Sequence, residues 1–588
     1  MNHLARLTFL LAAILFCQTQ AATYYTCDCQ TGADANCLPG NDSATGLTPA
    51  TAWRTFGKAR QMFSAMNGGD SILFSRGGSF SQSGNATWVN AKSTASRPIV
   101  LSAYMPSWAS GDEAKPLIRT STGSPFWLAD GGNSDHEEGY VIEKLSLMGH
   151  DSSGNWGVFL ANDIDHVTMD SLIIDSFSIG VHVAGGNHPT TGTDSLSSHI
   201  ILRNSLIRNN SGQGWLGGGD SCLVENCLFE NNGFALAVFN HNIYMSHGKG
   251  VVIRNNRLHR SALISGQTAG VSLVIHGIME DLLIEGNTIW EDIGACGQGT
   301  WGIAVDPGYA TAEAFRNVTI RGNKVINVGN LGIGMAACSS CVIENNVIIH
   351  EQPYGISAIG VPDRQRGPED SAMTSVIIRN NSIYVNNGAS GGTGITLGTE
   401  GTGHVCVSNI VRFAGSAGFT SFNFNLAASN YRATGYNIVA DPGFANPASP
   451  TYDLSLSSTS KAIGAGHPTL STTVDFNGRA RKQPPDAGAY ESDFSASESG
   501  ISGSPDKPSL KIVSAFMRRS VVEYSLPAAT VVELDVFNIR GSKISTLVSG
   551  QETFGNHFVT WNAGAQTGIF FCRLRTAGTI IAKKLVLF

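Results

Sequence analysis

The chain has 588 residues, of which only 14% are charged, while 68 are glycine. This length is too great for one compact core, and so little charge excludes a helical protein held together by ion pairs. The formal net charge is −7 and basic residues form no block longer than a doublet. Nucleic acid is therefore not expected as a partner.

The N-terminal 21 residues have the features of a secretory signal peptide. Arg6 is followed by an apolar run over 7–16, and then by Thr19 and Ala21 at the small positions before a cleavage site. The run has roughly half of the twenty or so apolar residues that a membrane span needs. We therefore predict a signal peptide over 1–21, cut after Ala21, and no membrane span.

Ten of the eleven cysteines follow the predicted cleavage site. An even number in an exported chain permits disulfide bonds. Cys338 and Cys341 form a CxxC motif, but no second CxxC or histidine pair follows at zinc-finger spacing. A local disulfide or a pair of stacked, buried thiols is therefore expected at this motif, rather than a metal.

A six-residue block repeats through the middle of the chain: apolar, Arg or Glu, Asn or Gly, Asn, any residue, apolar. Its clearest copies are IRNNRL at 253–258, IEGNTI at 284–289, IRGNKV at 320–325, IENNVI at 343–348 and IRNNSI at 378–383. With looser copies before them, the spacings run from 22 to 36 residues, which is the range of solenoid repeats. A constant block with variable spacing predicts constant strands joined by variable loops.

Each period also holds a second strand-like pattern of Gly, aliphatic, any residue, aliphatic, as at 302–305 and 332–335. The period-two alternation predicts three short strands per repeat and no helix. Stacked coils pair such strands in parallel at about 4.8 Å. The central Asn of the block is expected to adopt the left-handed conformation at a tight turn and to hydrogen-bond its equivalents in neighbouring coils.

The chain resembles the right-handed parallel β-helix family, the pectate-lyase-like superfold, over 22–491. The resemblance includes an opening with YYTCDCQTGADAN and RPIVLSAY, and a close with DPGF at 441–444 and DAGAYE at 486–491. It implies an N-terminal cap and first coils over 22–120, and further coils with a closing segment over 121–491. One fold of this kind hosts lyases, hydrolases, epimerases and adhesins, so it does not fix the chemistry.

A stretch rich in Ser, Gly and Pro at 492–509 reads as a linker. Alternating segments over 510–588 then predict a small antiparallel, Ig-like β-sandwich. These segments resemble the C-terminal sorting domains of the type IX (Por) secretion system, through the turn at 538–541, Trp561, 568–571 and 583–588. The resemblance implies the secretion machinery as a partner, and a secreted or cell-surface protein of a Gram-negative-type bacterium. An Ig-like accessory binding module is the alternative.

The outward positions of the Gly-aliphatic strands are the expected place for chemistry. In the family that the chain resembles, the acting surface is usually the outer face of the strand that follows the longest loops. Alternation along a strand turns every second residue outward. His182, between two valines, and Tyr244, between an isoleucine and a methionine, are therefore expected on that face.

Titratable residues gather over 240–260 in a chain that is otherwise poor in charge. Histidines that cluster are stronger candidates for function than a lone outward histidine. The candidate catalytic residues are His241, Tyr244, Lys249 and Arg260; the candidate substrate-binding residues are His182, His247, His276 and Trp301; and the candidate metal ligand is Asp306.

The reaction that these residue types favour is β-elimination on a polysaccharide containing uronic acid. Lys249, His241 or Tyr244 could remove the C5 proton, while Arg260 or Ca²⁺ held by Asp306 could neutralise the carboxylate. No paired acidic motif for hydrolysis stands out, and the DPHD motif of alginate epimerases is absent. A hydrolase, an epimerase and a non-catalytic glycan-binding adhesin remain alternatives. We expect a monomer whose partner is an extracellular polysaccharide.

Two other polar patterns have structural interpretations. Oxygen-bearing residues over 34–42 could hold Ca²⁺, but a simple turn is the favoured interpretation. Acidic and basic residues also recur at one position of the repeat and predict a solvated ladder of charges; they are Glu225, Arg254, Glu285, Arg321, Glu344 and Arg379.

Overall fold

The structure is a computed structural model. It describes residues 21–129, 137–150, 154–184, 196–308, 312–363, 367, 369–424, 430–494, 507–516, 519–527, 530–552, 555–563 and 568–587. All but the last residue of the predicted signal peptide, and most of the predicted linker, lie outside the described residues. Among the residues that are described, no helix is long and apolar enough to cross a membrane.

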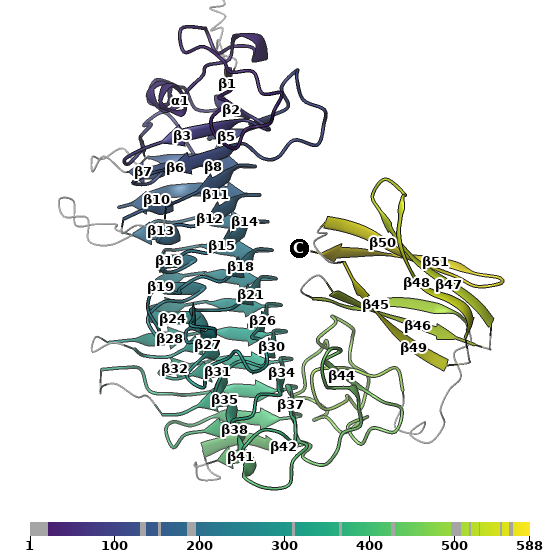
Figure 1. Cartoon of the computed structure of the whole chain (residues 1–588). Helices are drawn as coiled ribbons and strands as arrows, with labels where there is room; N and C mark the ends of the chain where they lie inside the picture. Colours follow the sequence, from purple (N-terminus) through teal and green to yellow (C-terminus); the bar gives the residue numbers. More distant parts are fainter. Residues whose placement is uncertain are drawn as a thin grey trace, which may run out of the picture.

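Three long parallel sheets form the solenoid (Figure 1). Sheet A contains β1 (Thr23–Thr26), β2 (Ser71–Ser75), β5 (Ile99–Tyr104), β8 (Glu138–Glu143), β11 (Asp165–Asp170), β14 (Ile201–Arg203), β17 (Leu223–Glu225), β20 (Val252–Arg254), β25 (Leu283–Glu285), β29 (Thr319–Arg321), β33 (Val342–Glu344), β36 (Ile377–Arg379), β39 (His404–Val407) and β42 (Tyr431–Gly435). Sheet B contains β3 (Ser79–Gln82), β6 (Leu117–Thr120), β9 (Ser146–Met148), β12 (Ile173–Asp175), β15 (Leu206–Arg208), β18 (Leu228–Glu230), β21 (Arg257–His259), β26 (Thr288–Trp290), β30 (Lys324–Ile326), β34 (Val347–His350), β37 (Ser382–Val385) and β40 (Ile410–Phe413).

Sheet C completes each coil. It contains β4 (Thr87–Trp88), β7 (Phe126–Ala129), β10 (Trp156–Ala161), β13 (Ile179–Ala184), β16 (Trp215–Gly218), β19 (Ile243–Lys249), β24 (Val271–Glu280), β27 (Trp301–Val305), β31 (Leu331–Met335), β35 (Ile356–Val361), β38 (Gly392–Leu397) and β41 (Phe419–Phe424), with β28 (Ala314–Arg316) and β32 (Cys338–Ser339) added beyond the end of β24. The stacked parallel strands confirm the predicted all-β solenoid, and the right-handed sense of its coil stays a prediction.

The N-terminal end of the solenoid is covered by a small cap. Helix α1 (Phe56–Phe63) follows a 3₁₀ turn (Pro49–Thr51) and begins at Thr55, whose side chain accepts a hydrogen bond from the Lys58 N–H. The helix buries Phe56 and Phe63 in the core of the first coils. A disulfide bond between Cys29 and Cys37 closes a loop of the cap. The remaining cysteines of the described residues, including the CxxC pair, are free and buried.

A ladder of buried asparagines joins the coils at the turn between sheets A and B. Each Nδ2 donates to the Oδ1 of the next asparagine over 2.9–3.1 Å. The members are Asn256, Asn287, Asn323, Asn346, Asn381, Asn409 and Asn437. The predicted ladder is confirmed, but the left-handed conformation does not fall on the ladder asparagine itself. The positive φ falls on the residue before each ladder asparagine, as at Asn255 (56°) and Gly286 (66°).

The outer face of sheet A carries the predicted ladder of charges. Neighbouring coils alternate in sign, and the Arg254–Glu225, Arg321–Glu285 and Arg379–Glu344 pairs lie at 2.7–2.8 Å. The register adds Asp170 and Arg203 at the start of the same row. These partly exposed pairs stabilise only weakly, which agrees with the solvated interpretation.

The closing segment folds back along the outside of the solenoid and covers part of sheet B. It includes the short antiparallel pair β43 (Phe444–Asn446) and β44 (Asp453–Leu456), which Figure 1 shows beside β34 and β37. Tyr452 and Leu454 pack against Trp290 and Ile349 of sheet B. The Lys324 ammonium donates to the carbonyl of Tyr452 over 2.7 Å, and its burial lowers its pKa to about 8.

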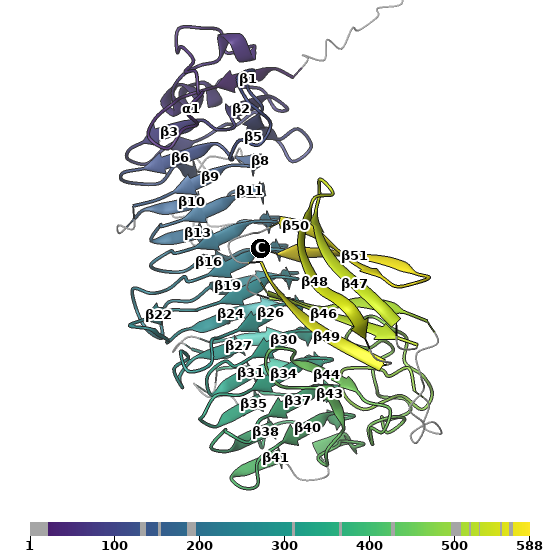
Figure 2. The same cartoon turned by 45° about the vertical axis from the view of Figure 1, so that its right-hand side comes forward.

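The C-terminal domain has two antiparallel sheets that share one hydrophobic core (Figure 2). One sheet contains β45 (Ser509–Phe516), β46 (Arg519–Leu526) and β49 (Gly555–Asn562); the other contains β47 (Thr530–Asn538), β48 (Lys543–Glu552), β50 (Gly568–Arg575) and β51 (Ile580–Leu587). Trp561 of the first sheet packs against Phe570 of the second, with ring centroids 4.9 Å apart. The two-sheet arrangement agrees with the predicted sandwich.

The asparagine ladder predicts a large difference between two substitutions in one coil. Asn323→Ala removes the partner of Asn287 and Asn346 and leaves buried polar groups unpaired, at about 1–3 kcal/mol each. Arg321→Ala breaks only the partly exposed pair with Glu285 and should cost less than about 1 kcal/mol. Denaturant unfolding of both variants measures the difference. Equal costs would contradict the ladder's role in stability.

Candidate active site

The outer face of sheet C differs from the other two outer faces in carrying almost no charge. Among its described strands, the only Asp, Glu, Lys or Arg residues are Lys249, Glu280 and Arg316. These three are partners in the strand register at the far ends of β19, β24 and β28. The rest of the face is built from aromatic, histidine, small and apolar side chains, so it is the surface to search for chemistry.

Tyr244 lies at the centre of a group of rings on this face. Its ring centroid is 5.8 Å from that of His241, to which it is nearly parallel at 17°, and 5.4 Å from that of His276. Tyr244 and Trp301 both pack on a small apolar patch that includes Val274. The structure therefore brings four of the predicted site residues together, from the adjacent strands β19, β24 and β27 and the residues before them.

His276 lies beside Glu313, which belongs to the loop before β28 and has no exposed side-chain surface. The two carboxylate oxygens of Glu313 accept hydrogen bonds from the backbone N–H groups of Gly277, over 2.6 Å, and Gly308. Its Oε1 lies 3.5 Å from Nδ1 of His276. The backbone N–H of Glu313 donates to Asp370 over 3.0 Å, which fixes the loop. The histidine side chain itself retains 15% exposure, so the imidazole reaches the surface.

Sequence reasoning missed Glu313 because it belongs to a loop of variable length, outside the repeated block. Gly308 contributes a second constraint on the same ring. A Cβ on Gly308 would come within 2.2 Å of Cε1 of His276. Gly308 thus allows the close approach of the loop to His276.

His241 has an environment that disfavours the predicted role as a base. Its Nδ1 accepts a hydrogen bond from the Val271 N–H over 3.2 Å, which assigns the proton of the neutral ring to Nε2. Burial, with a smaller effect of His276, lowers its pKa to about 3. A neutral imidazole of such low basicity binds protons poorly at neutral pH, which disfavours His241 as the base; its ring lies nearly parallel to that of Tyr244.

Lys249 and Arg260 do not join this group. Lys249 lies five residues beyond Tyr244 and pairs with Glu280 at 3.3 Å, after a register shift between Ser246 and Gly248. Arg260 follows β21 of sheet B with a positive φ of 51° and binds Asp292 at 2.8 Å. The titratable residues over 240–260 therefore lie on two faces of the coil, whereas the sequence predicted one group.

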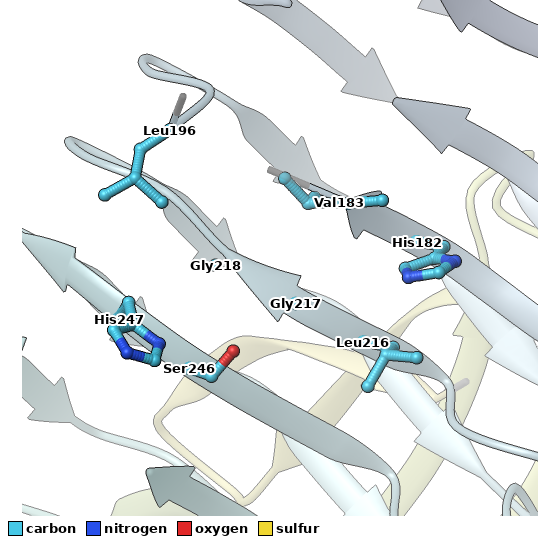
Figure 3. Close-up of a pocket in the computed structure, with 9 residues that line it drawn as sticks. His182, Val183, Leu196, Leu216, Gly217, Gly218, Ser246 and His247 are labelled. Atoms are coloured by element: carbon cyan, nitrogen blue, oxygen red, sulfur yellow. The ribbon is translucent and has the colours of Figure 1, made fainter. Parts of the chain in front are cut away.

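His182 and His247 line a shallow pocket of about 330 Å³ on the N-terminal side of Tyr244 (Figure 3). The pocket crosses β13, β16 and β19, and its floor includes the consecutive glycines Gly217 and Gly218. Gly217 has a φ of +104°, and a Cβ there would lie 1.8 Å from a backbone oxygen. The pocket exists because position 217 must be glycine, which has no side chain to fill the space.

An aromatic cluster continues the face beyond the pocket. Trp127, Trp156, Phe159 and His182 make ring contacts with centroid distances of 4.3–5.5 Å. Burial among these rings lowers the pKa of His182 to about 4. His182 is thus a neutral, aromatic member of this surface.

Asp306 stands next to His276 in the strand register, because it follows Val305, the partner of Ile275. Among the described residues, the only tight group of three potential metal ligands is Cys27, Cys29 and Cys37. One carboxylate falls short of the six to eight oxygen ligands of Ca²⁺. The oxygen-rich stretch at 34–42 contains turns, in which side-chain oxygens accept from backbone N–H groups within the cap.

Comparisons with known proteins give no family. No family model matches the chain, and no curated protein matches it. Solved structures with a similar fold include a pectate lyase, which is 15% identical with a TM-score of 0.36 and covers 80% of this chain and 97% of that chain. An A-module of an Azotobacter vinelandii mannuronan C-5 epimerase is 13% identical with a TM-score of 0.37, covering 65% and 95%. A tailspike protein of an E. coli bacteriophage, in complex with a pentasaccharide, is 12% identical with a TM-score of 0.41, covering 95% and 93%.

The burial of His182 predicts a loss of stability in acid. Its pKa of about 4 lies below the unfolded value of 6.5, so stability is present above pH 6.5 and is lost as the pH falls toward 4. We expect His182→Phe to lose less stability than the parent between about pH 7 and pH 4.5, by at most about 1.4 kcal/mol per pH unit. Denaturant unfolding at both pH values measures this, with the exposed His199→Phe as control. Parallel losses in the parent and His182→Phe would contradict the assignment.

Proposed function

We propose that the chain is an enzyme acting on extracellular polysaccharide, and that its reaction is β-elimination at a uronic acid residue. The observation that supports this most is the contact between the rings of Tyr244 and His276 on the open face of sheet C, with Glu313 beside His276. Elimination requires one group to remove a proton and another to protonate the leaving oxygen. Two adjacent proton-transfer side chains on an exposed strand surface provide both.

His276 is the proposed base and Tyr244 the proposed acid. The C5–H bond breaks as Nε2 of His276, the ring nitrogen directed away from Glu313, takes the proton. The electron pair forms the C4–C5 double bond, the C4–O bond breaks, and the phenol of Tyr244 protonates the departing oxygen. The carboxylate of Glu313 lies 3.5 Å from the other ring nitrogen, Nδ1. After release, His276 gives its proton to solvent and the phenolate of Tyr244 regains one from solvent.

Neutralisation of the substrate carboxylate is the part of the reaction for which the chain supplies the fewest groups. Asp306 is the proposed ligand of a Ca²⁺ shared with that carboxylate, which would lower the pKa of the C5 proton. Among the described residues, no tight group of three potential ligands includes Asp306, so the substrate and water would supply the other ligands. The proton transfers assigned above use only side chains of this chain.

Hydrolysis fits the site less well. It needs two carboxyl groups flanking the glycosidic bond. Asp306 is one candidate, but Glu313 is buried and both its oxygens accept backbone hydrogen bonds. Epimerisation would share the first proton transfer with β-elimination and return a proton to the opposite face of C5. The proposed signal peptide and sorting domain would place the enzyme outside the cell or on its surface, through the secretion machinery.

Glycan binding without cleavage is the second candidate function. It is favoured by one observation, the cluster of Trp127, Trp156 and Phe159 on the same face as Tyr244. Aromatic rings at a surface provide apolar planes for recognition, with Trp also offering a polar edge. This candidate predicts binding that survives loss of His276.

The test is a paired assay on the chain from residue 22 onward, with polysaccharides of different uronate content. Absorbance of unsaturated uronate and new reducing ends should rise together. Tyr244→Phe and His276→Gln should each lower kcat by about 10²-fold or more, since each removes a proton-transfer group. Tyr436→Phe, at an exposed tyrosine, is the matched control and should retain full activity.

The other outcomes separate the alternatives. Reducing ends without absorbance would overturn elimination in favour of hydrolysis, and loss of activity with a chelator, restored by Ca²⁺, would support a cation at Asp306. Full activity of both Tyr244→Phe and His276→Gln would exclude this site. Binding without either product would support the glycan-binding candidate.

A further inference from the structure

The candidate site is part of a longer row of side chains that runs along the solenoid axis. Seven residues on successive strands from β7 to β27 are aligned by the strand register. They are Trp127, Phe159, His182, Leu216, Tyr244, Val274 and Ala304. Six steps of about 4.8 Å give this row a length of about 29 Å. We call this row, with Trp156, Trp301 and the pocket beside it, the track.

The track contains no Lys or Arg, although the chain places both elsewhere. Lys249 and Arg316 stand beyond its edge, where Lys249 is paired with Glu280. On sheet A, by contrast, an acidic or basic side chain occurs in almost every coil. A polymer with a carboxylate on every sugar would lose hydration along the track without gaining ionic partners, which costs free energy.

Neutral sugars meet a more favourable surface on the track. The rings of Trp127 and Trp156 are half-buried, and thus rigidly held, yet still accessible. Large aromatic planes bury apolar area without losing much conformational freedom on binding. The pocket at Gly217 and Gly218 separates this cluster from Tyr244 and offers about 330 Å³, within the range of small-ligand sites.

We propose that the track binds a heteropolysaccharide in which single uronic acids are separated by neutral sugars. Neutral units occupy the aromatic cluster and the pocket, and one uronate lies beside Tyr244, His276 and Asp306. The position of the uronate rests on the proposed function; the neutral character of the other positions rests on the composition of the track alone. The substrate class is therefore a glycan of low charge density, and not a homopolymer of uronic acid.

Calorimetric binding to His276→Gln, which keeps the track but removes the proposed base, tests this inference separately from turnover. The probes are gellan, whose backbone separates glucuronate by neutral sugars, pectate and alginate as homopolyuronates, and neutral xylan. We expect gellan to bind at least about tenfold more tightly than pectate or alginate. Its affinity should change little between about 50 mM and 500 mM NaCl, because no cationic groove is involved.

Substitutions at the cluster make the test specific. Trp156→Ala should weaken gellan binding about tenfold, as loss of a buried aromatic anchor does. Trp156→Phe should recover most of the affinity and shows whether the alanine variant fails only by misfolding. Tyr436→Ala, at an exposed aromatic outside the track, should bind as the parent does.

The outcomes distinguish this inference from the proposed function. Tighter, salt-sensitive binding to pectate or alginate, no binding to any probe, or gellan binding that is insensitive to Trp156→Ala would each overturn the inference. Cleavage of pectate or alginate by the parent chain in preference to gellan would also overturn it and leave β-elimination standing. Trp156-dependent binding of gellan or xylan with no cleavage of any probe would retain the neutral track and reject the enzyme.

Discussion

The hydrogen-bonded stacking of one coil on the next is the constraint on which the rest of the structure depends. The buried amides of the asparagine ladder have partners only if every coil turns at the same place, as Asn287 shows by bonding to Asn256 and Asn323. A buried amide left without a partner costs about 1–3 kcal/mol. The corner between sheets A and B is therefore uniform, while the loops around sheet C are free to differ. The candidate site includes residues from these variable loops.

The three outer faces show how one repeat can serve three purposes. Sheet A places its outward positions in water and fills them with alternating charges, such as Arg254 between Glu225 and Glu285. Part of sheet B is apolar because the closing segment covers it, with Tyr452 and Leu454 in contact. The described strands of sheet C carry charge only at Lys249, Glu280 and Arg316, and aromatic and apolar side chains pack around Tyr244. The composition of sheet C is therefore explained neither by solvation of charges nor by packing of the closing segment.

Local patterns in the sequence predicted the features of the fold that depend on alternation along a strand and on the repeated six-residue block. The strands and the outward positions of His182 and Tyr244 follow from period two, and the asparagine and charge ladders follow from the repeated block. What depends on loops could not be predicted in this way. Glu313 lies beside His276 and belongs to a variable loop. Lys249 lies away from Tyr244, beyond a register shift that follows Ser246. Proximity in sequence predicted that Lys249 and Arg260 lie with Tyr244. They do not, because residues 241–260 pass over two faces of one coil.

The near absence of charge on sheet C constrains the chemistry as much as the groups that are present. Removing a proton next to a carboxylate requires that one carboxylate be neutralised at the reacting sugar, and only there. A track with cations at every step would bind a polyuronate equally well in every register. In the proposed complex, aromatic and apolar positions such as Trp127 and Leu216 would instead contact neutral sugars and leave the place beside His276 to the uronate. An uncharged surface around one proposed proton-transfer pair would thus select where along the glycan the reaction occurs, as well as which glycan binds.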